Sequence, residues 1–476
     1  MDGTAVVVGA GPNGLAAAAR LAVAGMKVTV YEQDGVVGGA ARSGDVLGEG
    51  TVTDLGAAAH PFGVGSPAFR ELGLEQRGLE WIHPRYPMAH PLPDGTSAIL
   101  HRDAAETARS LGVDARAWLR VHQPVTKRPL DALENLLGPL VRMPPHPATM
   151  ASFGMRAAWP ASVLARSVFR TEAARALFAG SAAHSTLPLG HPMTAAFGVI
   201  FGGLGHTTGW PVAKGGTQRI TDALLAVVLE NGGTVHTNSP VTDLRQLPTS
   251  DAVLLDLTPR QLLKLEGADL TDRYRAHLRR WKYGTGVFKV DYLLDGPAPW
   301  ADPRTAGAGT VHVGGTLGEL MEAERQSNRG QPPERPFVLV SQQSGADPTR
   351  APEGRQVLWS YAHVPNGSTQ PMGARIDAQL ERFAPGFRDR IIGRVETSPS
   401  QLESWNPNLV GGDVGGGSLA GVQQVFRPVP TLKPYNTGTP GLYVCSSSTP
   451  PGGGVHGMGG WNAAKAVMKD LARTRR

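Results

Sequence analysis

The chain begins with a glycine turn set between a strand and a helix. Residues 4–8 form a short apolar and β-branched run, and Gly9-Ala10-Gly11-Pro12-Asn13-Gly14 follows at once. An alanine-rich run then predicts a helix that ends at Gly25, and residues 27–31 predict a second strand. This order of strand, GxGxxG turn, helix and strand is typical of a βαβ unit that binds a dinucleotide.

Each glycine of the turn has a separate physical task. Gly9 permits the tight turn, Gly11 lets the backbone approach a diphosphate, and Gly14 lets the helix pack on the strand. The first turn of the helix offers free N–H groups and a partial positive charge to phosphates. Glu32 lies 18 residues after Gly14, close to the spacing at which an acid binds ribose hydroxyls. A carboxylate there would also repel the 2′-phosphate of NADP.

A second glycine pair follows soon after Glu32. In Gly38-Gly39-Ala40-Ala41-Arg42, the glycines would let the backbone pass close to a diphosphate and a ribityl chain. Arg42 could neutralise phosphate charge or point at a flavin ring, and a solvated surface arginine is the alternative. This segment favours FAD over NAD.

Two end segments carry a resemblance to a known family. They are GAGPNGLAAAARLA…VTVYEQDGVVGGAARS near the start and GLYVCSSSTPPGGGVHGMGGWNAAKAV at residues 441–467. In both, the chain resembles the amine oxidase/phytoene desaturase superfamily of flavoproteins. It is most similar to the phytoene desaturase-like branch, and within that to the pyridine nucleotide-disulfide oxidoreductase domain 2 group. The resemblance implies an α/β fold of the two-dinucleotide-binding-domain flavoprotein type. A Rossmann-like FAD/NAD(P)-binding domain would be joined to a substrate domain of mixed sheet plus helical cap.

The resemblance also implies which parts of the chain meet the cofactor, which is FAD in that family. There the C-terminal glycine turn and helix close over the flavin, and the segment 54–74 runs beside it. This chain departs from the family where Cys445-Ser446-Ser447-Ser448 replaces a glycine and a small or acidic residue. The predicted cofactor-binding residues are Gly9, Gly11, Pro12, Asn13, Gly14, Glu32, Gln33, Gly38, Gly39, Ala40, Ala41, Arg42, Ala57, Ala58, Val241, Ser446, Gly454, Val455, Gly457 and Met458.

Two histidines are candidate catalytic residues. His60 follows the segment expected beside the flavin, and His456 lies inside the C-terminal glycine turn. Because an imidazole titrates near neutral pH, either could act as a general base or orient the substrate. The alternative for each is a hydrogen-bonded structural histidine. The sequence has no compact cluster of His, Cys and carboxylate residues, so no metal site is predicted.

The chain length predicts more than one domain. At 476 residues the chain is too long for one core, because single cores stop growing near ~250–300 residues. We expect a discontinuous FAD-binding domain over 1–75, 205–260 and 405–476, and a substrate-binding and cap domain over 76–204 and 261–404. Strands are expected at 276–294, 308–314, 336–342 and 356–364, with helices over most of 105–205. The segment 151–170 is expected to line a substrate tunnel, with a membrane-seeking helix as the alternative.

Charge and cysteine usage limit the partners. The net charge is +6, but the basic residues are scattered and not interleaved with aromatics. This predicts an ordinary basic surface and no nucleic-acid partner. A mild attraction to anionic lipid, and with it a peripheral membrane contact, stays open. The one cysteine, Cys445, excludes a disulfide within the chain and suits a reducing, cytoplasmic location.

Three functions follow as hypotheses. The first is an FAD-dependent oxidoreductase of the dehydrogenase or desaturase type. It would pass a hydride from a C–H bond of an apolar substrate, such as an isoprenoid, a polyene or a secondary metabolite, to flavin N5. The second is a flavin amine oxidase. The third is an FAD-binding protein that acts as a non-redox isomerase or as a partner subunit. The oligomeric state stays open.

Overall fold

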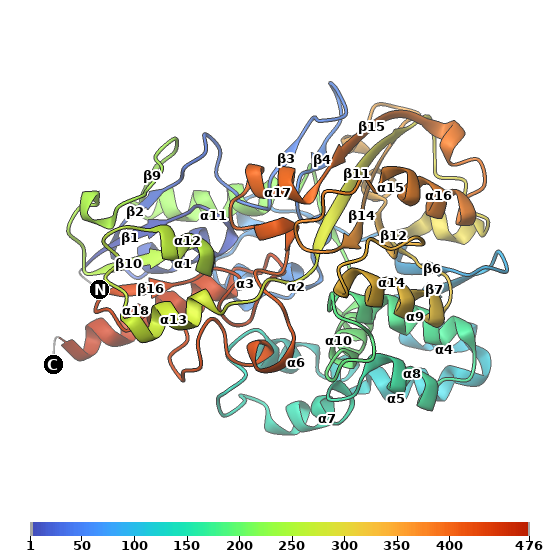
Figure 1. The fold of residues 1–476 in the computed structure, drawn as a ribbon, viewed down its shortest axis with the longest axis horizontal. Helices are drawn as coiled ribbons and strands as arrows, with labels where there is room; N and C mark the ends of the chain where they lie inside the picture. Colours follow the sequence, from blue (N-terminus) through green and yellow to red (C-terminus); the bar gives the residue numbers. More distant parts are fainter. Residues whose placement is uncertain (1–2, 475–476) are drawn as a thin grey trace.

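The computed structural model describes residues 3–474 and places two main sheets side by side (Figure 1). One sheet has five strands and carries the N-terminal glycine turn, and the other has seven. A group of helices lies below the seven-stranded sheet in Figure 1. This arrangement confirms the predicted α/β class, with a Rossmann-like domain beside a mixed sheet and a helical cap.

All strands of the five-stranded sheet run parallel, in the order β16-β10-β1-β2-β9. Their bounds are β1 Thr4–Val8, β2 Lys27–Tyr31, β9 Thr234–His236, β10 Ala252–Leu255 and β16 Leu442–Val444. Side chains alternate between the faces, so Ala5 and Val7 pack on one side and Val6 and Val8 on the other. Because the strands are parallel, their carboxyl ends meet at one edge, where α/β sheets bind ligands.

Helices cover both faces of this sheet. One face shares a core with α1, α11 and α18, and the other with α12 and α13. Their bounds are α1 Pro12–Val23, α11 Gln218–Glu230, α12 Pro259–Lys264, α13 Asp272–Arg279 and α18 Met458–Thr474.

The start of the strand predicted at 276–294 is wrong. Residues 276–279 belong to α13, and β11 begins only at Gly286. Thr271 caps α13, since its side-chain oxygen accepts a hydrogen bond from the Tyr274 N–H. Tyr274 and Leu278 then bury one face of the helix against the parallel sheet.

The seven-stranded sheet is mixed, in the order β15-β11-β14-β13-β12-β6-β7. The neighbours β6 and β12 run parallel, and the other neighbouring pairs run antiparallel. The bounds are β6 Tyr86–Pro91, β7 Ser97–Leu100, β11 Gly286–Leu294, β12 Ala308–Val313, β13 Val338–Ser341, β14 Gln356–Val364 and β15 Ile391–Thr397.

The two faces of the seven-stranded sheet have different partners. Val290 and Leu358 face one side and pack with Ile376 of α16 (Gly373–Phe383). Met88 and Leu339 face the other side and share the large core of the cap helices and α1. The cap helices are α4 Ala104–Ser110, α5 Ala115–Thr126, α6 Pro129–Leu136, α7 Pro147–Ala157, α8 Ala161–Val168, α9 Glu172–Ala183 and α10 Ala195–Gly205. One continuous core therefore joins the cap to the dinucleotide-binding side.

The segment 151–170 forms parts of two helices rather than one, because Pro160 separates α7 from α8. Its Met155, Trp159 and Val163 side chains are exposed. Across residues 3–474, no helix is both long and apolar enough to cross a bilayer. The strands of the parallel sheet lie in the segments 1–75, 205–260 and 405–476, and those of the mixed sheet lie in 76–204 and 261–404.

Candidate functional site

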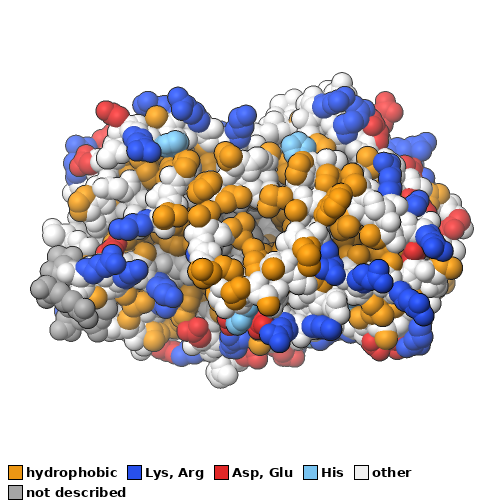
Figure 2. Space-filling model, turned by 90° about the horizontal axis from the view of Figure 1, so that it is seen from below, with side chains coloured by type: hydrophobic (Ala, Val, Ile, Leu, Met, Phe, Trp, Pro, Cys, Tyr) orange, Lys and Arg blue, Asp and Glu red, His pale blue; other side chains and the backbone are white. Residues whose placement is uncertain are grey.

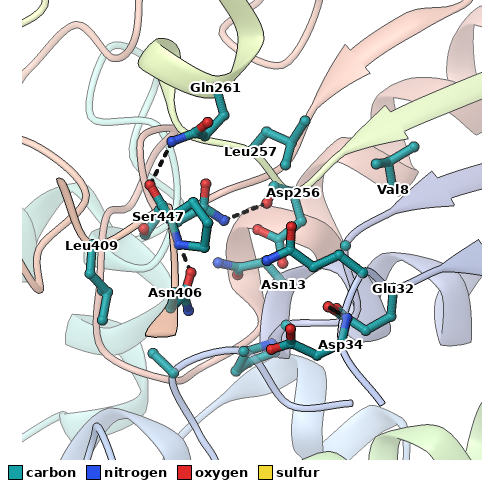
Figure 3. Close-up of a pocket in the computed structure, with 18 of the residues that line it drawn as sticks. Val8, Asn13, Glu32, Asp34, Asp256, Leu257, Gln261, Asn406, Leu409 and Ser447 are labelled. Carbon is teal, nitrogen blue, oxygen red and sulfur yellow. Dashed lines mark hydrogen bonds between the residues drawn. The ribbon is translucent and has the colours of Figure 1, made fainter. Parts of the chain in front are cut away.

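A pocket lies at the carboxyl ends of β1, β2 and β10 (Figure 3). Its volume of about 350 Å³ is in the range of small-ligand sites. On the side of β2 and β9 it is lined by Glu32 and Val241. On the side of β16 it is lined by Gly454 and Val455. The pocket therefore extends along the carboxyl edge of the parallel sheet, from the side of β2 and β9 to the side of β16.

The two glycine segments form one wall because they touch. A β-carbon on Gly14 would lie 2.0 Å from the Gly9 carbonyl oxygen, so α1 can approach β1 only with glycine there. A β-carbon on Gly39 would lie 3.0 Å from the Gly11 α-carbon. The Gly38 N–H also donates to the Ala10 carbonyl oxygen at 2.8 Å. The predicted close approaches are thus present in the backbone itself.

Glu32 is fixed at the end of β2 by two backbone donors. Its Oε2 accepts from the Ala10 N–H at 2.7 Å, and its Oε1 accepts from the Asp34 N–H at 3.0 Å. The side chain is buried and lines the pocket. Each carboxylate oxygen keeps a lone pair for a further donor, such as a ribose hydroxyl.

Arg42 lies between the second glycine pair and Trp405 and contacts both. Its Nη1 forms an ion pair with Asp34 at 2.9 Å, and its Nε donates to the Gly39 carbonyl oxygen at 3.1 Å. Its guanidinium lies 4.8 Å from the ring centroid of Trp405, the last residue of α17 (Pro399–Trp405). A cation at this position is available to a phosphate group.

The C-terminal turn carries backbone strain. Val455 has φ +49°, in the left-handed region that a β-branched residue rarely adopts. Strain of this kind costs about 1–3 kcal/mol and clusters at ligand-binding sites. Gly453, Gly454 and Val455 all line the pocket immediately before α18.

The pocket brings together most of the predicted cofactor residues. Those that line it are Gly9, Gly11, Pro12, Asn13, Glu32, Gln33, Gly39, Ala40, Arg42, Val241, Gly454 and Val455. The other predicted residues do not line it, and they are Gly14, Gly38, Ala41, Ala57, Ala58, Ser446, Gly457 and Met458. The Ala57 N–H, for example, donates to the Ala40 carbonyl oxygen at 3.0 Å.

The two candidate catalytic histidines are buried and outside the lining of this pocket. His60 Nε2 shares a hydrogen bond with Thr217 Oγ1 at 2.9 Å, and burial lowers the pKa of His60 to about 4. His456 Nδ1 accepts from the Met458 N–H at 3.1 Å, and burial lowers its pKa to about 4. Both rings are therefore neutral at pH 7.

The sequence reasoning missed one carboxylate and one wall of the pocket. Asp256 lines the pocket directly after β10. An acid that follows a third apolar strand is the sequence pattern that could have predicted it. Residues 405–409 line it from the far side. The Gln261 amide donates to the Pro407 carbonyl oxygen at 2.7 Å, and the Asn408 amide to the Asp256 carbonyl oxygen at 2.9 Å. These bonds hold the segment across the pocket (Figure 3).

The described residues, 3–474, contain no group of three or more His, Cys, Asp or Glu side chains arranged to hold a metal ion. The pocket lining itself places the N-terminus of α1 and the Glu32 carboxylate on one surface, an arrangement that offers hydrogen-bond donors to an anion and an acceptor to hydroxyl groups.

Comparisons with known proteins agree with this geometry. Residues 7–72 match the family described as an NAD(P)-binding Rossmann-like domain. Pyridine nucleotide-disulfide oxidoreductase domain-containing protein 2 of Rattus norvegicus is 26% identical, over 98% of this chain and 93% of that protein. Phytoene desaturase (neurosporene-forming) of Rhodobacter capsulatus is 27% identical, over 98% of this chain and 94% of its own.

A solved structure supports the fold alone. Cyclohexylamine oxidase from Brevibacterium oxydans superposes with a TM-score of 0.60 at 16% identity, over 99% of this chain and 100% of that chain. The chain is therefore a homologue of pyridine nucleotide-disulfide oxidoreductase domain-containing protein 2 and of the phytoene desaturases, with a Rossmann-like domain near its N-terminus.

Proposed function

We propose that the chain is an FAD-dependent oxidoreductase of the dehydrogenase or desaturase type that acts on an apolar substrate. One observation carries the proposal. A single pocket lining joins the α1 N-terminus and Glu32 to the C-terminal glycines Gly453 and Gly454. A ligand that reaches all of these must be elongated, as a dinucleotide is. The likeness to a phytoene desaturase supports the flavin among dinucleotides and an apolar substrate.

The residues present fit FAD. A β-carbon on Gly11 would lie 2.7 Å from Asp256 Oδ2 and one on Gly39 would lie 3.0 Å from the Gly11 α-carbon, so the narrow cradle requires glycine at both positions. Asn13 Oδ1 is buried and has no hydrogen-bond partner among residues 3–474. Glu32 would hold the ribose hydroxyls and Arg42 the phosphate charge, while residues 453–455 would lie against the ring system. Bound FAD supplies the hydride acceptor for the reaction.

Aromatic side chains continue from the C-terminal turn towards the mixed sheet. A β-carbon on Gly454 would lie 3.0 Å from Phe62 Cδ2. The ring centroids of Phe62 and Phe201 are 5.1 Å apart, and those of Phe201 and His184 are 4.9 Å apart. Such rings would pack against an apolar chain and exclude water from it. This position, next to the expected flavin ring, is where the substrate would lie.

Two polar groups of this region, His184 and Tyr361, are neutral at pH 7. Burial lowers the pKa of His184 to about 3 and raises the pKa of Tyr361 well above its usual value. His184 Nε2 and His312 Nε2 share a hydrogen bond at 3.0 Å. The Glu324 carboxylate is already bonded to His363 Nδ1 at 2.7 Å. A neutral substrate suits this region better than the alkylammonium ion of an amine oxidase substrate.

The surface also favours an apolar ligand. Figure 2 shows the molecule from below, where hydrophobic side chains gather around a central hollow. A hollow with an apolar rim is the feature that a lipid-like molecule would meet first.

The cofactor content and reduction of the purified chain test the proposal. We expect released FAD at about one per chain, and loss of flavin absorption in anaerobic solution with isoprenoid or polyene substrates. Gly39→Ala should lose FAD, because its β-carbon would strike Gly11. Gly154→Ala is the matched control, since a β-carbon in α7 meets nothing within 4 Å.

Other outcomes separate the alternatives. Peroxide release with amines would identify an amine oxidase. Product formation without flavin reduction would identify a non-redox isomerase. A folded chain that binds no FAD would overturn the proposal.

A further inference from the structure

Asp256 brings a carboxyl group into the cradle expected to hold the diphosphate. Its N–H donates to the Val8 carbonyl oxygen at 2.8 Å, which fixes it at the carboxyl end of β1. Its Oδ2 accepts a hydrogen bond from the Gly14 N–H at 2.9 Å. A β-carbon on Gly11 would stand 2.7 Å from the same oxygen. Figure 3 shows Asp256 and Asn13 among the residues at the centre of the pocket.

These are the groups that a dinucleotide needs. In a βαβ unit, the N–H groups of the glycine turn and of the first helical turn receive the diphosphate. An ionised Asp256 would place a second anion beside that diphosphate. Two like charges a few ångströms apart repel each other strongly where little solvent lies between them. The site therefore cannot bind the diphosphate tightly while Asp256 is ionised.

The surroundings of Asp256 leave its charge uncompensated. From α12, Lys264 lines the same pocket, and Arg42 lines it from the second glycine segment. Arg42 is held by Asp34 at 2.9 Å, and in the described part of the chain neither cation forms an ion pair with Asp256. The carboxyl is only 8% exposed. A charged form there is costly because the side chain is largely removed from solvent and no cation of residues 3–474 pairs with it.

The other facing groups add to that cost. The Glu32 carboxylate faces Asp256 from the end of β2, and the buried Cys445 thiol faces it from the end of β16. Burial and then Glu32 raise the pKa of Asp256 to about 7, against the opposing hydrogen bond from Gly14. Near neutral pH the carboxyl therefore exists in both forms.

We propose that Asp256 takes up one proton from solvent when the chain binds its dinucleotide, so that the ligand diphosphate replaces the carboxylate charge at the glycine turn. This inference rests on the proposed function, since it takes FAD as the dinucleotide. Only the protonated chain is then competent to bind, and the apparent Kd rises as that fraction falls. Above pH 7 the Kd should rise about tenfold for each pH unit, and below pH 6 it should be flat.

The test measures FAD binding to the full chain after its bound flavin is removed. Quenching of FAD fluorescence gives the Kd from pH 6 to 9 for the wild type and for Asp256→Asn, which is neutral at every pH. Calorimetry at pH 8 in phosphate and in Tris gives the number of protons taken up. We expect a Kd rise of roughly 50-fold between pH 7 and 9 in the wild type, with nearly one proton taken up at pH 8. In Asp256→Asn we expect a flat Kd and no proton uptake.

Each other outcome has one meaning. A wild-type Kd that stays flat would overturn the inference and leave the proposed function intact. A rise that persists in Asp256→Asn would assign the proton to another group and overturn it as well. If the folded wild-type chain binds no FAD at any pH, the proposed function fails and this inference fails with it. The wild-type titration needs no variant, so it decides the matter even if Asp256→Asn does not fold.

Discussion

The backbone oxygen of Asn13 lies 1.7 Å from the place where a β-carbon on Gly460 would stand. Asn13 is in the first turn of α1 and Gly460 is in the first turn of α18, so the two ends of the chain meet at a glycine. The contact continues along both helices. Arg20 Nη1 donates to the Trp461 carbonyl oxygen at 3.0 Å, and its guanidinium lies 3.7 Å from the Trp461 ring centroid. The pocket thus depends on a contact between residues more than 400 positions apart.

Gly460→Ala should destabilise the chain and weaken FAD binding. The added methyl group must push α18 away from α1, and overpacking of this kind costs about 1–3 kcal/mol. Urea unfolding of the variant and its retention of FAD would measure both effects. Gly154→Ala, within α7 and free of contacts, should instead gain about 0.5–1 kcal/mol. Equal stability of the two variants would contradict the tight contact at Asn13.

Neutralising the buried Asp54 should lower the free energy of unfolding much more than neutralising an exposed acidic residue that also forms an ion pair. Its Oδ2 forms an ion pair with Arg350 at 2.7 Å, with both side chains fully buried. Its Oδ1 accepts from the Thr217 N–H at 2.7 Å. Asp54→Asn leaves Asp347, at 3.2 Å from Arg350 Nε, as the buried carboxylate still paired with Arg350, and loss of the Asp54 charge should cost about 1.5–3 kcal/mol in urea unfolding.

The matched control is Glu80→Gln. Glu80 pairs with Lys214 at 2.8 Å, but the two side chains are 60% and 46% exposed. Loss of this pair should change the unfolding free energy by no more than about 1 kcal/mol. A small effect at both positions would show that Asp347 alone compensates the Arg350 charge when Asp54 is neutral.

The structure could be predicted from the sequence where a local pattern of residues determines it. The glycine turn, the helix after it and Glu32 lie within one βαβ unit, so spacing alone predicts their geometry. Asp256 and Trp405 reach the same pocket from strands and helices more than 200 residues away. No local pattern specifies such a meeting, because it depends on strand order. At 276–279 a capped amphipathic helix was mistaken for the start of a strand, since the cap at Thr271 lay outside the apolar run.

Asp256→Asn should stabilise the cofactor-free chain at neutral pH but not in acid. The folded-state pKa of about 7 exceeds the ordinary value of 3.8, because of burial and then Glu32. Below pH 3.8 both states hold the proton and stability is unaffected. As the pH rises towards 7, only the unfolded chain ionises, so the wild type loses up to roughly 4 kcal/mol.

Urea unfolding at pH 4 and pH 8 measures this difference. The gain of Asp256→Asn over the wild type should be near zero at pH 4 and largest at pH 8. Asp243→Asn is a control of opposite sign, because the hydrogen bond from Arg245 lowers the pKa of Asp243. That variant should gain nothing at pH 8. A constant gain for Asp256→Asn at both pH values would mean that the carboxyl is not protonated in the folded chain.

Trp405→Ala should weaken FAD binding without unfolding the chain. The indole forms part of the pocket wall, and its ring centroid is 4.8 Å from the Arg42 guanidinium. This contact helps to fix Arg42, which would meet the phosphate charge. A contact of this kind contributes about 0.5–2 kcal/mol, so its loss should raise the Kd for FAD by no more than about 30-fold. Trp159→Ala is the matched control, because Trp159 is 50% exposed and lies just after α7, outside the pocket. If both variants bind FAD as the wild type does, residues 405–409 cover the pocket without contacting the ligand.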